Sequence, residues 1–318
     1  MTRLPAILRP NRLEITGSVF LAIAMGVIGG GVAASRVLGP LLGRFPSYCL
    51  GPESVKPADC DHFVGRINDY ENVLSNIGPA AIAITVALPL IAAIVLGLAL
   101  TARELEQQTT VFAWSLAPSR RRWLLSRLGP LLLVVAAMCL VAGALADAIF
   151  GLQSTVDPWR SLDGLGTRGP PVAGMGALAM GVTLFVGSLL GRQLPALLAA
   201  VALTASASAL ASGVTDRWLD QESLIAPSDQ LSEGDRFVAM LFLTPEGEAI
   251  GWEEAERRYG TAIYEVDTQQ LGLTQVFRYV PGERYPTAVA RLTAIQLLVG
   301  AVGIGLALVV VQRRRPWA

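Results

Sequence analysis

The chain has 318 residues, of which 53% are hydrophobic and 16% charged, and its formal net charge at pH 7 is zero. Soluble globular domains carry about 25% charged residues, so this composition excludes an ordinary water-soluble protein. We expect no nucleic-acid partner for it.

Six apolar runs lie along the chain, each close to the roughly 20 residues that a helix needs to cross the hydrocarbon core of a membrane. The runs are 15–34, 77–100, 128–150, 172–190, 194–214 and 292–311. Because a backbone in lipid must satisfy its own hydrogen bonds, these runs predict helices. The predicted fold is therefore an all-α polytopic membrane protein with six transmembrane helices.

The first run follows a basic, amphipathic segment, 1–14, that carries three arginines. A signal peptide also has a basic front, and residues 32–35 resemble a cleavage site. The apolar stretch 15–34 is longer than a usual signal core, which favours a retained first span.

Cys49 and Cys60 lie in the loop between the first two runs, which we predict to be outside the cell. Disulfides persist in oxidising compartments, so a Cys49–Cys60 bridge is one prediction and two free thiols are the alternative. No group of Cys and His residues has the spacing of a metal site, and His62 is the only histidine. We therefore predict neither a metal site nor a catalytic site.

The loop 101–127 is an amphipathic segment that suits the membrane surface. Trp114 and Trp123 are typical of a membrane interface, and Ser119 can cap a helix that leads into the third span. An exposed segment with both acids and bases can dock on a soluble partner. Alternatively, its two glutamates only solvate the end of the second helix.

The fifth run, 194–214, contains several hydroxyl side chains, which predicts that it faces other helices. The loop 215–285 is acidic and is the largest segment outside the membrane. Within it, 252–259 predicts a short helix, and 237–243 and 261–266 predict short helices or strands. We predict a small extracytoplasmic cap with a solvated acidic face. A gate or a cation-attracting surface is the alternative.

Charges close to the runs predict the orientation. With six spans, twelve arginines and only three glutamates fall on one side, in segments 1–14, 101–127, 191–193 and 312–318. Lys and Arg in short segments beside the spans mark the cytoplasmic side, so both termini are predicted to be cytoplasmic in a multi-pass cell-membrane protein. The predicted divisions are 1–14, 15–214 with the coupling loop 101–127, 215–285 and 286–318.

Three short segments carry a family resemblance: R-E-L-E-Q-Q-T at 103–109, A-W-S at 113–115 and S-R-R-R-W at 119–123. Together they resemble the signature of ABC-2 type transporter permease subunits, closest to the group common in actinobacteria. Segments 8–13 and 279–285 resemble the stretches before the first and last spans of that family. In the family, the acidic segment lies on a cytoplasmic coupling helix that contacts the ATPase subunit. The resemblance implies that the docking residues are Arg103, Glu104, Glu106, Thr109, Trp114, Arg120, Arg121 and Trp123.

The resemblance also implies the membrane subunit of an ATP-driven exporter, which forms the translocation path with a second permease subunit as a homodimer or heterodimer. The sequence contains no G-x-x-x-x-G-K-[ST] phosphate loop, because its only lysine, Lys56, stands in a Ser-Val-Lys-Pro context. We expect ATP and Mg on separate ATPase chains, no cofactor on this one, and no enzyme activity of its own. A receptor or scaffold that acts through 215–285 and an ion-coupled secondary transporter remain alternatives.

Overall fold

The structure is a computed structural model, and it describes residues 12–34, 46, 49, 58–107, 119–153, 157–232, 234–260 and 271–314. The chain divides into two compact units. The helical unit comprises Met1–Thr155, Gly166–Ser212 and Val289–Ala318, and the sheet unit comprises Val156–Leu165 and Gly213–Ala288.

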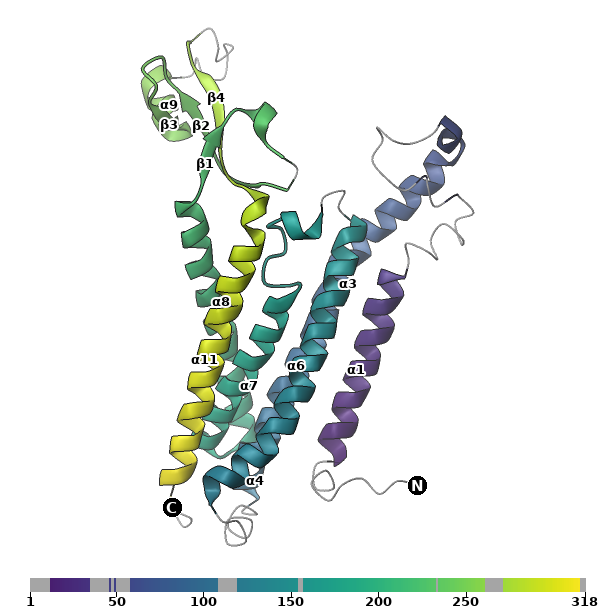
Figure 1. Ribbon diagram of the computed structural model, residues 1–318, viewed down its shortest axis with the longest axis vertical. Coiled ribbons are helices and arrows are strands. Elements are labelled where there is room, and N and C mark those ends of the chain that lie inside the picture. The colour runs from purple at the N-terminus through teal and green to yellow at the C-terminus, as the bar shows by residue number, and fades with distance from the viewer. Residues whose placement is uncertain are drawn as a thin grey trace. The chain divides into compact units, whose positions relative to one another are not determined.

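Long helices build the helical unit (Figure 1). They are α1 (Arg12–Ala33), α3 (Val64–Leu98), α6 (Arg120–Gln153), α7 (Pro170–Leu190), α8 (Gln193–Gln221) and α11 (Tyr285–Arg313), the last two shared with the sheet unit. Helix α3 contacts α1, α6 and α7, and α6 also contacts α1 and α7. Their common core is apolar, with Leu96 of α3, Val135 of α6 and Leu184 of α7 all buried.

Within the described residues, five helices are long and apolar enough to cross a membrane. They contain the five apolar runs that follow residue 76, so the prediction of a polytopic, mostly helical membrane protein is confirmed at this level. The fifth run, 194–214, lies in α8 and is one of the five. Helix α1 contributes a shorter apolar stretch, Val19–Ala33.

The second predicted span is part of a much longer helical stretch. It starts with η4 (Ala58–Phe63) and α3, and it continues through η5 (Ala99–Arg103), which is π-helical, into α4 (Glu104–Glu106). The stretch Asp59–Glu106 has 48 residues, which at 1.5 Å per residue is roughly 70 Å, more than twice the thickness of a hydrocarbon core. The helical stretch therefore begins before the apolar run 77–100 and ends after it. Its first turns are polar, and they continue the same helix outside the predicted span.

Glycine and proline set both ends of α7. Gly169, at φ 63°, precedes the helix, and Pro170 takes its first position, where a missing N–H costs no hydrogen bond. At the other end Gly191 adopts the left-handed conformation at φ 64° and donates its N–H to the carbonyl of Gly187. Because α8 begins at Gln193, this left-handed turn reverses the chain within two residues.

The sheet unit holds a four-stranded antiparallel sheet in the order β1-β4-β2-β3, which the predicted all-α class did not include. Its strands are β1 (Leu224–Ala226), β2 (Arg236–Leu243), β3 (Ala249–Gly251) and β4 (Thr274–Val280). Two short helices lie between strands, η7 (Ser228–Gln230) and α9 (Trp252–Tyr259). Two more belong to the unit: η6 (Pro158–Arg160) lies between α6 and α7, and η8 (Gly282–Arg284) lies between β4 and α11. Of the predicted elements, 252–259 is the helix α9 and 237–243 is a strand, whereas 261–266 lies outside the described residues.

Apolar packing and surface ion pairs hold the sheet unit together. Phe242, Ile250 and Leu273 form its buried core. On the surface, Arg258 pairs with Glu254 at 2.7 Å and with Glu248 at 2.8 Å. The hydrogen bond from Arg258 is the main reason that the pKa of the Glu254 carboxyl lies below its usual value.

Arginines of the sheet also bind the last turns of α8. Arg278 of β4 donates to Ser223 Oγ at 2.7 Å and to the carbonyl of Asp220 at 2.8 Å. Arg236 of β2 forms an ion pair with Asp216 at 2.5 Å. The bond from Arg278 to Asp220 satisfies a carbonyl group that the end of a helix leaves without a partner.

Candidate functional site

Most of the arginines that the structure describes in the helical unit gather at one end of it, which we call the basic end. The helices that meet there are the end of the α3–η5–α4 stretch, the start of α6, the end of α7, the start of α8 and the end of α11. Its arginines are Arg103, Arg120, Arg121, Arg122, Arg127, Arg192, Arg313 and Arg314. This end carries the described part of the predicted coupling loop 101–127.

Glu104 does not project from the basic end as a free charge. Its carboxylate accepts a hydrogen bond from Arg127 of α6, in an ion pair whose side chains are 16% and 26% exposed. The Arg127 guanidinium also lies 4.8 Å from the ring centroid of Trp123, which is buried against Leu124 and Val311. The pair therefore fixes the end of the α3 stretch to the start of α6.

Glu106 caps the neighbouring helix. Its side-chain oxygen accepts the backbone N–H of Gln193 at 2.9 Å, where α8 begins. The first N–H groups of a helix have no partners within the helix, and they carry partial positive charge that favours a carboxylate. Glu106 thereby joins the end of α4 to the start of α8.

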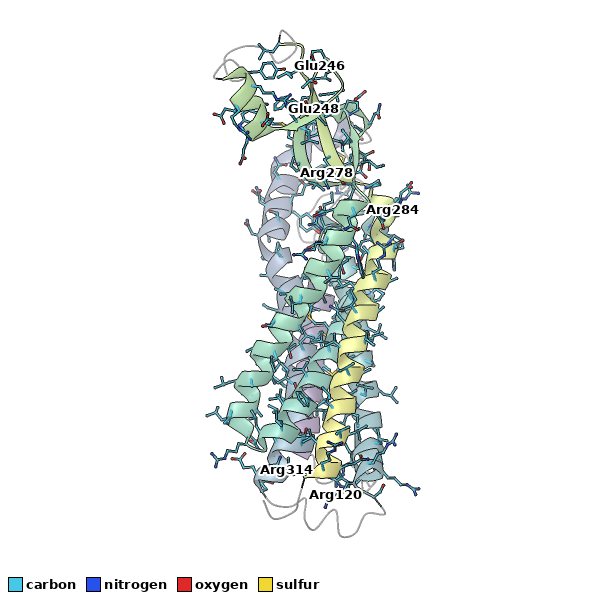
Figure 2. All side chains as sticks on the ribbon, turned by 90° about the vertical axis from the view of Figure 1, so that its left-hand side faces the viewer. Arg120, Glu246, Glu248, Arg278, Arg284 and Arg314 are labelled. Carbon is cyan, nitrogen blue, oxygen red and sulfur yellow. A yellow bond between two sulfur atoms is a disulfide. The ribbon has the colours of Figure 1, made fainter. Side chains whose placement is uncertain are left out.

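Two arginines connect α6, α7 and α11 at the same end (Figure 2). Arg120 donates to the carbonyl of Arg314 at 2.6 Å and to that of Gln312 at 3.4 Å. Arg314 in turn donates to the carbonyl of Ser188 in α7 at 2.5 Å. Charged donors strengthen these bonds, so the last carbonyls of two helices are satisfied by side chains from the chain itself.

The predicted docking residues thus divide by exposure. Glu106 and Arg121 are exposed, Arg103, Glu104 and Arg120 are half-buried, and Trp123 is buried. The other two, Thr109 and Trp114, lie outside the described residues. Ser119 Oγ accepts the N–H of Arg122, which is the helix cap that the sequence indicated for α6.

The opposite end of the helical unit holds an ion pair that the sequence did not reveal. Arg168, only 1% exposed, donates to Asp147 of α6 at 3.1 Å, and its guanidinium lies 4.2 Å from the ring centroid of Phe150. Gly143, one turn earlier in α6, accepts the N–H of Gly169, and a Cβ on Gly143 would collide with the Gly169 carbonyl. Asp147 is therefore paired with a buried arginine and is not solvated by water alone.

Helices α7 and α11 touch through their backbones. A Cβ on Gly181 would collide with the carbonyl of Gly300, and a Cβ on Gly303 would lie 2.6 Å from the carbonyl carbon of Gly181. Next to this contact, Gln296 is fully buried, and within the described residues neither amide atom of its side chain has a hydrogen-bond partner. Small residues bring these two helices together, as is typical of membrane helices.

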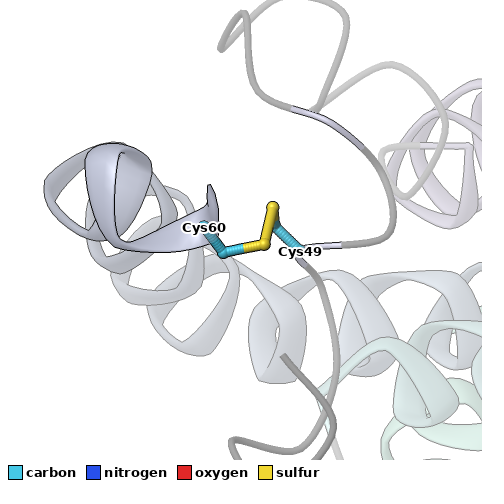
Figure 3. Close-up of a disulfide and its surroundings, with 2 residues drawn as sticks. All are labelled: Cys49 and Cys60. Atoms are coloured by element: carbon cyan, nitrogen blue, oxygen red, sulfur yellow. A yellow bond between two sulfur atoms is a disulfide. The ribbon is translucent and has the colours of Figure 1, made fainter. Parts of the chain in front are cut away.

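Cys49 and Cys60 form a disulfide that packs against Ile67 at the start of the long α3 stretch (Figure 3). The third cysteine, Cys139, is buried in the core of the helical unit. Within the described ranges, no group of His, Cys, Asp and Glu could hold a metal ion.

Some of these contacts could have been found in the sequence. Asp147 near the end of one apolar run and Arg168 just before the next are a plausible pair, because a short connection brings two such ends together. The Glu104–Arg127 pair carried the same signal, because Glu104 follows the run 77–100 and Arg127 directly precedes the run 128–150.

Comparison with known proteins agrees with this arrangement. The family model described as ABC-2 membrane transporter related matches residues 32–215, which is more than half of the chain and includes the predicted coupling loop 101–127. No curated protein and no solved structure matches the chain. With five candidate spans and this match, the chain is a membrane transport component, and it belongs to the ABC-2 membrane transporter related family.

Proposed function

We propose that this chain is the permease subunit of an ATP-driven exporter in a bacterial cell membrane. A second permease subunit completes the translocation path, and separate ATPase chains bind ATP and Mg. The observation that carries the proposal is a family match that includes the coupling loop, in a sequence whose only lysine excludes a phosphate loop. Energy from ATP therefore has to come from another chain.

The proposal includes six spans, with both termini in the cytoplasm. Helix α1 has 22 residues, and at about 1.5 Å per residue it would reach roughly 33 Å, enough for the hydrocarbon core. The basic end then faces the cytoplasm, because arginines beside the spans favour that side. The sheet unit follows as an extracytoplasmic domain.

The translocation path is proposed to lie between two permease subunits. Helices α7 and α11 are in backbone contact at Gly181 and Gly300, which leaves no room for a substrate between them. The core between α3, α6 and α7 is filled by apolar side chains. A path along a surface shared with a second subunit would not be blocked by these contacts within one chain.

The ATPase docking surface is proposed to be the exposed part of the basic end, together with the predicted residues Thr109 and Trp114. Glu106, Arg121 and Arg122 are exposed there. Glu104, Arg120 and Trp123 lie behind them in contacts that hold the helix ends in place. Their contribution to docking is thus to position the exposed side chains.

The test is affinity purification of the tagged full chain from its host, identification of any ATPase that co-purifies, and an ATPase assay. The double variant Arg121→Glu/Arg122→Glu should lose most of the co-purified ATPase. The control Arg257→Glu reverses the charge of an arginine that is 73% exposed in the sheet unit, and it should retain the complex.

The permease purified alone should hydrolyse no ATP. Hydrolysis by the lone chain would refute the need for a separate ATPase. Equal recovery of the ATPase with both charge-reversal variants would refute docking at the basic end.

A further inference from the structure

A cavity of about 360 Å³ opens beside the basic end, between the α3–η5 stretch and the first turn of α8. Its walls are mainly apolar, with one arginine and one glutamine among them. The lining residues are Val95, Leu98, Ala99, Arg103, Gln193, Leu194 and Leu197. Ligand cavities of this size commonly combine an apolar wall with a few polar groups that orient the ligand.

Polarity changes in one direction along this cavity. On the helix that forms one wall, Val95, Ala99 and Arg103 follow each other at intervals of four residues, so they lie on one face over roughly 12 Å. The apolar residue is farthest from the basic end and the arginine is at it. A ligand that fits this gradient has a hydrophobic part and an anionic head.

The backbone beside the cavity is π-helical, and this segment begins at Ala99 and ends at Arg103. Single π-turns widen a helix and occur often at functional sites. The opposite face of the segment is fixed, because Thr101 packs where Gly187 of α7 has no Cβ and donates its hydroxyl to the carbonyl of Gly97. The position of Arg103 is thus set by a packed helix rather than by a loop.

Local charge favours an anion at the polar end. Arg103 lines the cavity, and the exposed Arg192 directly precedes Gln193 in the chain. The nearby carboxylate of Glu106 is bound to the N–H of Gln193, and that of Glu104 is paired with Arg127. Both of these carboxylates are therefore engaged in contacts between helix ends.

Exposed apolar side chains continue from the cavity along the membrane-facing surface. Ile91 is 48% exposed one turn beyond Val95, and on α8 Leu198 and Val201 are 65% and 49% exposed. An acyl chain whose head lies at Arg103 would run along this stripe. A free phosphate would leave the apolar wall without contacts.

We propose that this cavity binds an anionic membrane phospholipid, with the headgroup phosphate at Arg103 and an acyl chain along Val95 and Leu197. An arginine at the mouth of a pocket between membrane helices is the kind of side chain that binds such headgroups. Arg103, which the family resemblance includes among the docking residues, is half-buried and lines this cavity. The exposed docking residues Glu106, Arg121 and Arg122 do not line it, so each proposal can fail without the other.

The test measures lipid binding to the delipidated full chain by native mass spectrometry. Phosphatidylglycerol and phosphatidylcholine with the same acyl chains are the probes. The wild type should prefer phosphatidylglycerol, and Arg103→Gln should weaken its binding about five-fold, the effect of roughly one arginine near a headgroup. Leu194→Glu should also weaken it, and since Leu194 is 68% exposed this variant should still fold.

The matched control is Arg313→Gln, which removes an exposed arginine of the basic end that does not line the cavity. It should change phosphatidylglycerol binding less than two-fold. An equal loss in Arg103→Gln and Arg313→Gln, or a wild type without lipid preference, would overturn the proposal. Displacement of the lipid by an equal concentration of inorganic phosphate would also overturn it, by assigning the site to a free anion.

Discussion

The buried pair of Asp147 and Arg168 gives the sharpest prediction about what holds the helical unit together. Arg168 is 1% exposed and Asp147 20% exposed, so the two ends of the pair differ in their access to water. Removing one partner from a buried pair costs about 3–5 kcal/mol, because the remaining charge is left uncompensated. Asp147→Leu should therefore destabilise the protein by about that amount.

Arg168→Met should cost less, about 1–3 kcal/mol, because Asp147 is partly exposed and because the main loss is the contact of the guanidinium with Phe150. The double variant Asp147→Leu/Arg168→Met replaces both charges by apolar groups of similar volume. It should lie within about 1 kcal/mol of the wild type, because neither charge remains buried.

The assay is reversible unfolding of the purified full chain in mixed micelles, followed by tryptophan fluorescence. The prediction is a coupling energy of at least about 3 kcal/mol between the two substitutions. If the double variant instead loses the sum of the two single losses, the residues do not act as a pair and the reasoning fails. Melting temperatures of the same four proteins should rank in the same order.

Three further predictions concern contacts in other parts of the chain. Gly181→Leu should cost about 3 kcal/mol or more in unfolding assays, because helix backbone cannot move aside, whereas Gly26→Leu should cost little because nothing lies within 4 Å of its added Cβ. Cys49→Ser/Cys60→Ser should lower stability by up to about 3 kcal/mol, the loop-closure entropy of a bridge with a sequence separation of 11, and reduction of the wild type should have the same effect. Glu104→Gln should cost about 1–2 kcal/mol by weakening a charged hydrogen bond, and unchanged unfolding would show that the ion pair contributes nothing.

The membrane-spanning helices were predictable because they depend on local composition. An apolar run of about 20 residues leaves the backbone no option in lipid except a helix, whatever the rest of the chain does. Even the hydroxyl-rich run followed this rule, and Thr204 on it is buried while Ser206 is exposed. The hydroxyl groups were therefore a correct guide to a helix–helix face at one position and not at the other.

The sheet unit was harder to predict because its strands are short and pair over long distances. Strand β4 pairs with β2 and β1, and no feature of residues 274–280 alone requires those partners. The helix contacts show the same difficulty. Gly26 and Gly30 match a close-packing motif but have nothing within 4 Å of an added Cβ, whereas Gly29 meets Thr85 at 2.9 Å. A glycine motif identifies a possible contact, and the rotation of the helix decides which glycine makes it.

At the basic end, the effect of a mutation on the contacts between helices is difficult to separate from its effect on the docking of a partner. A charge reversal at Glu104 would break its pair with Arg127 and loosen the end of α3 from α6, even if no ATPase were present. Loss of docking in such a variant would therefore have two explanations. Arg121 and Arg122 are exposed, and reversing their charge alters the surface without removing a contact between helix ends. If the ATPase docks there, Arg120 connects α6 directly to the end of α11. The Glu104–Arg127 pair and Glu106 connect α6 to α8 through α4, so a displacement of α6 would act on both helices.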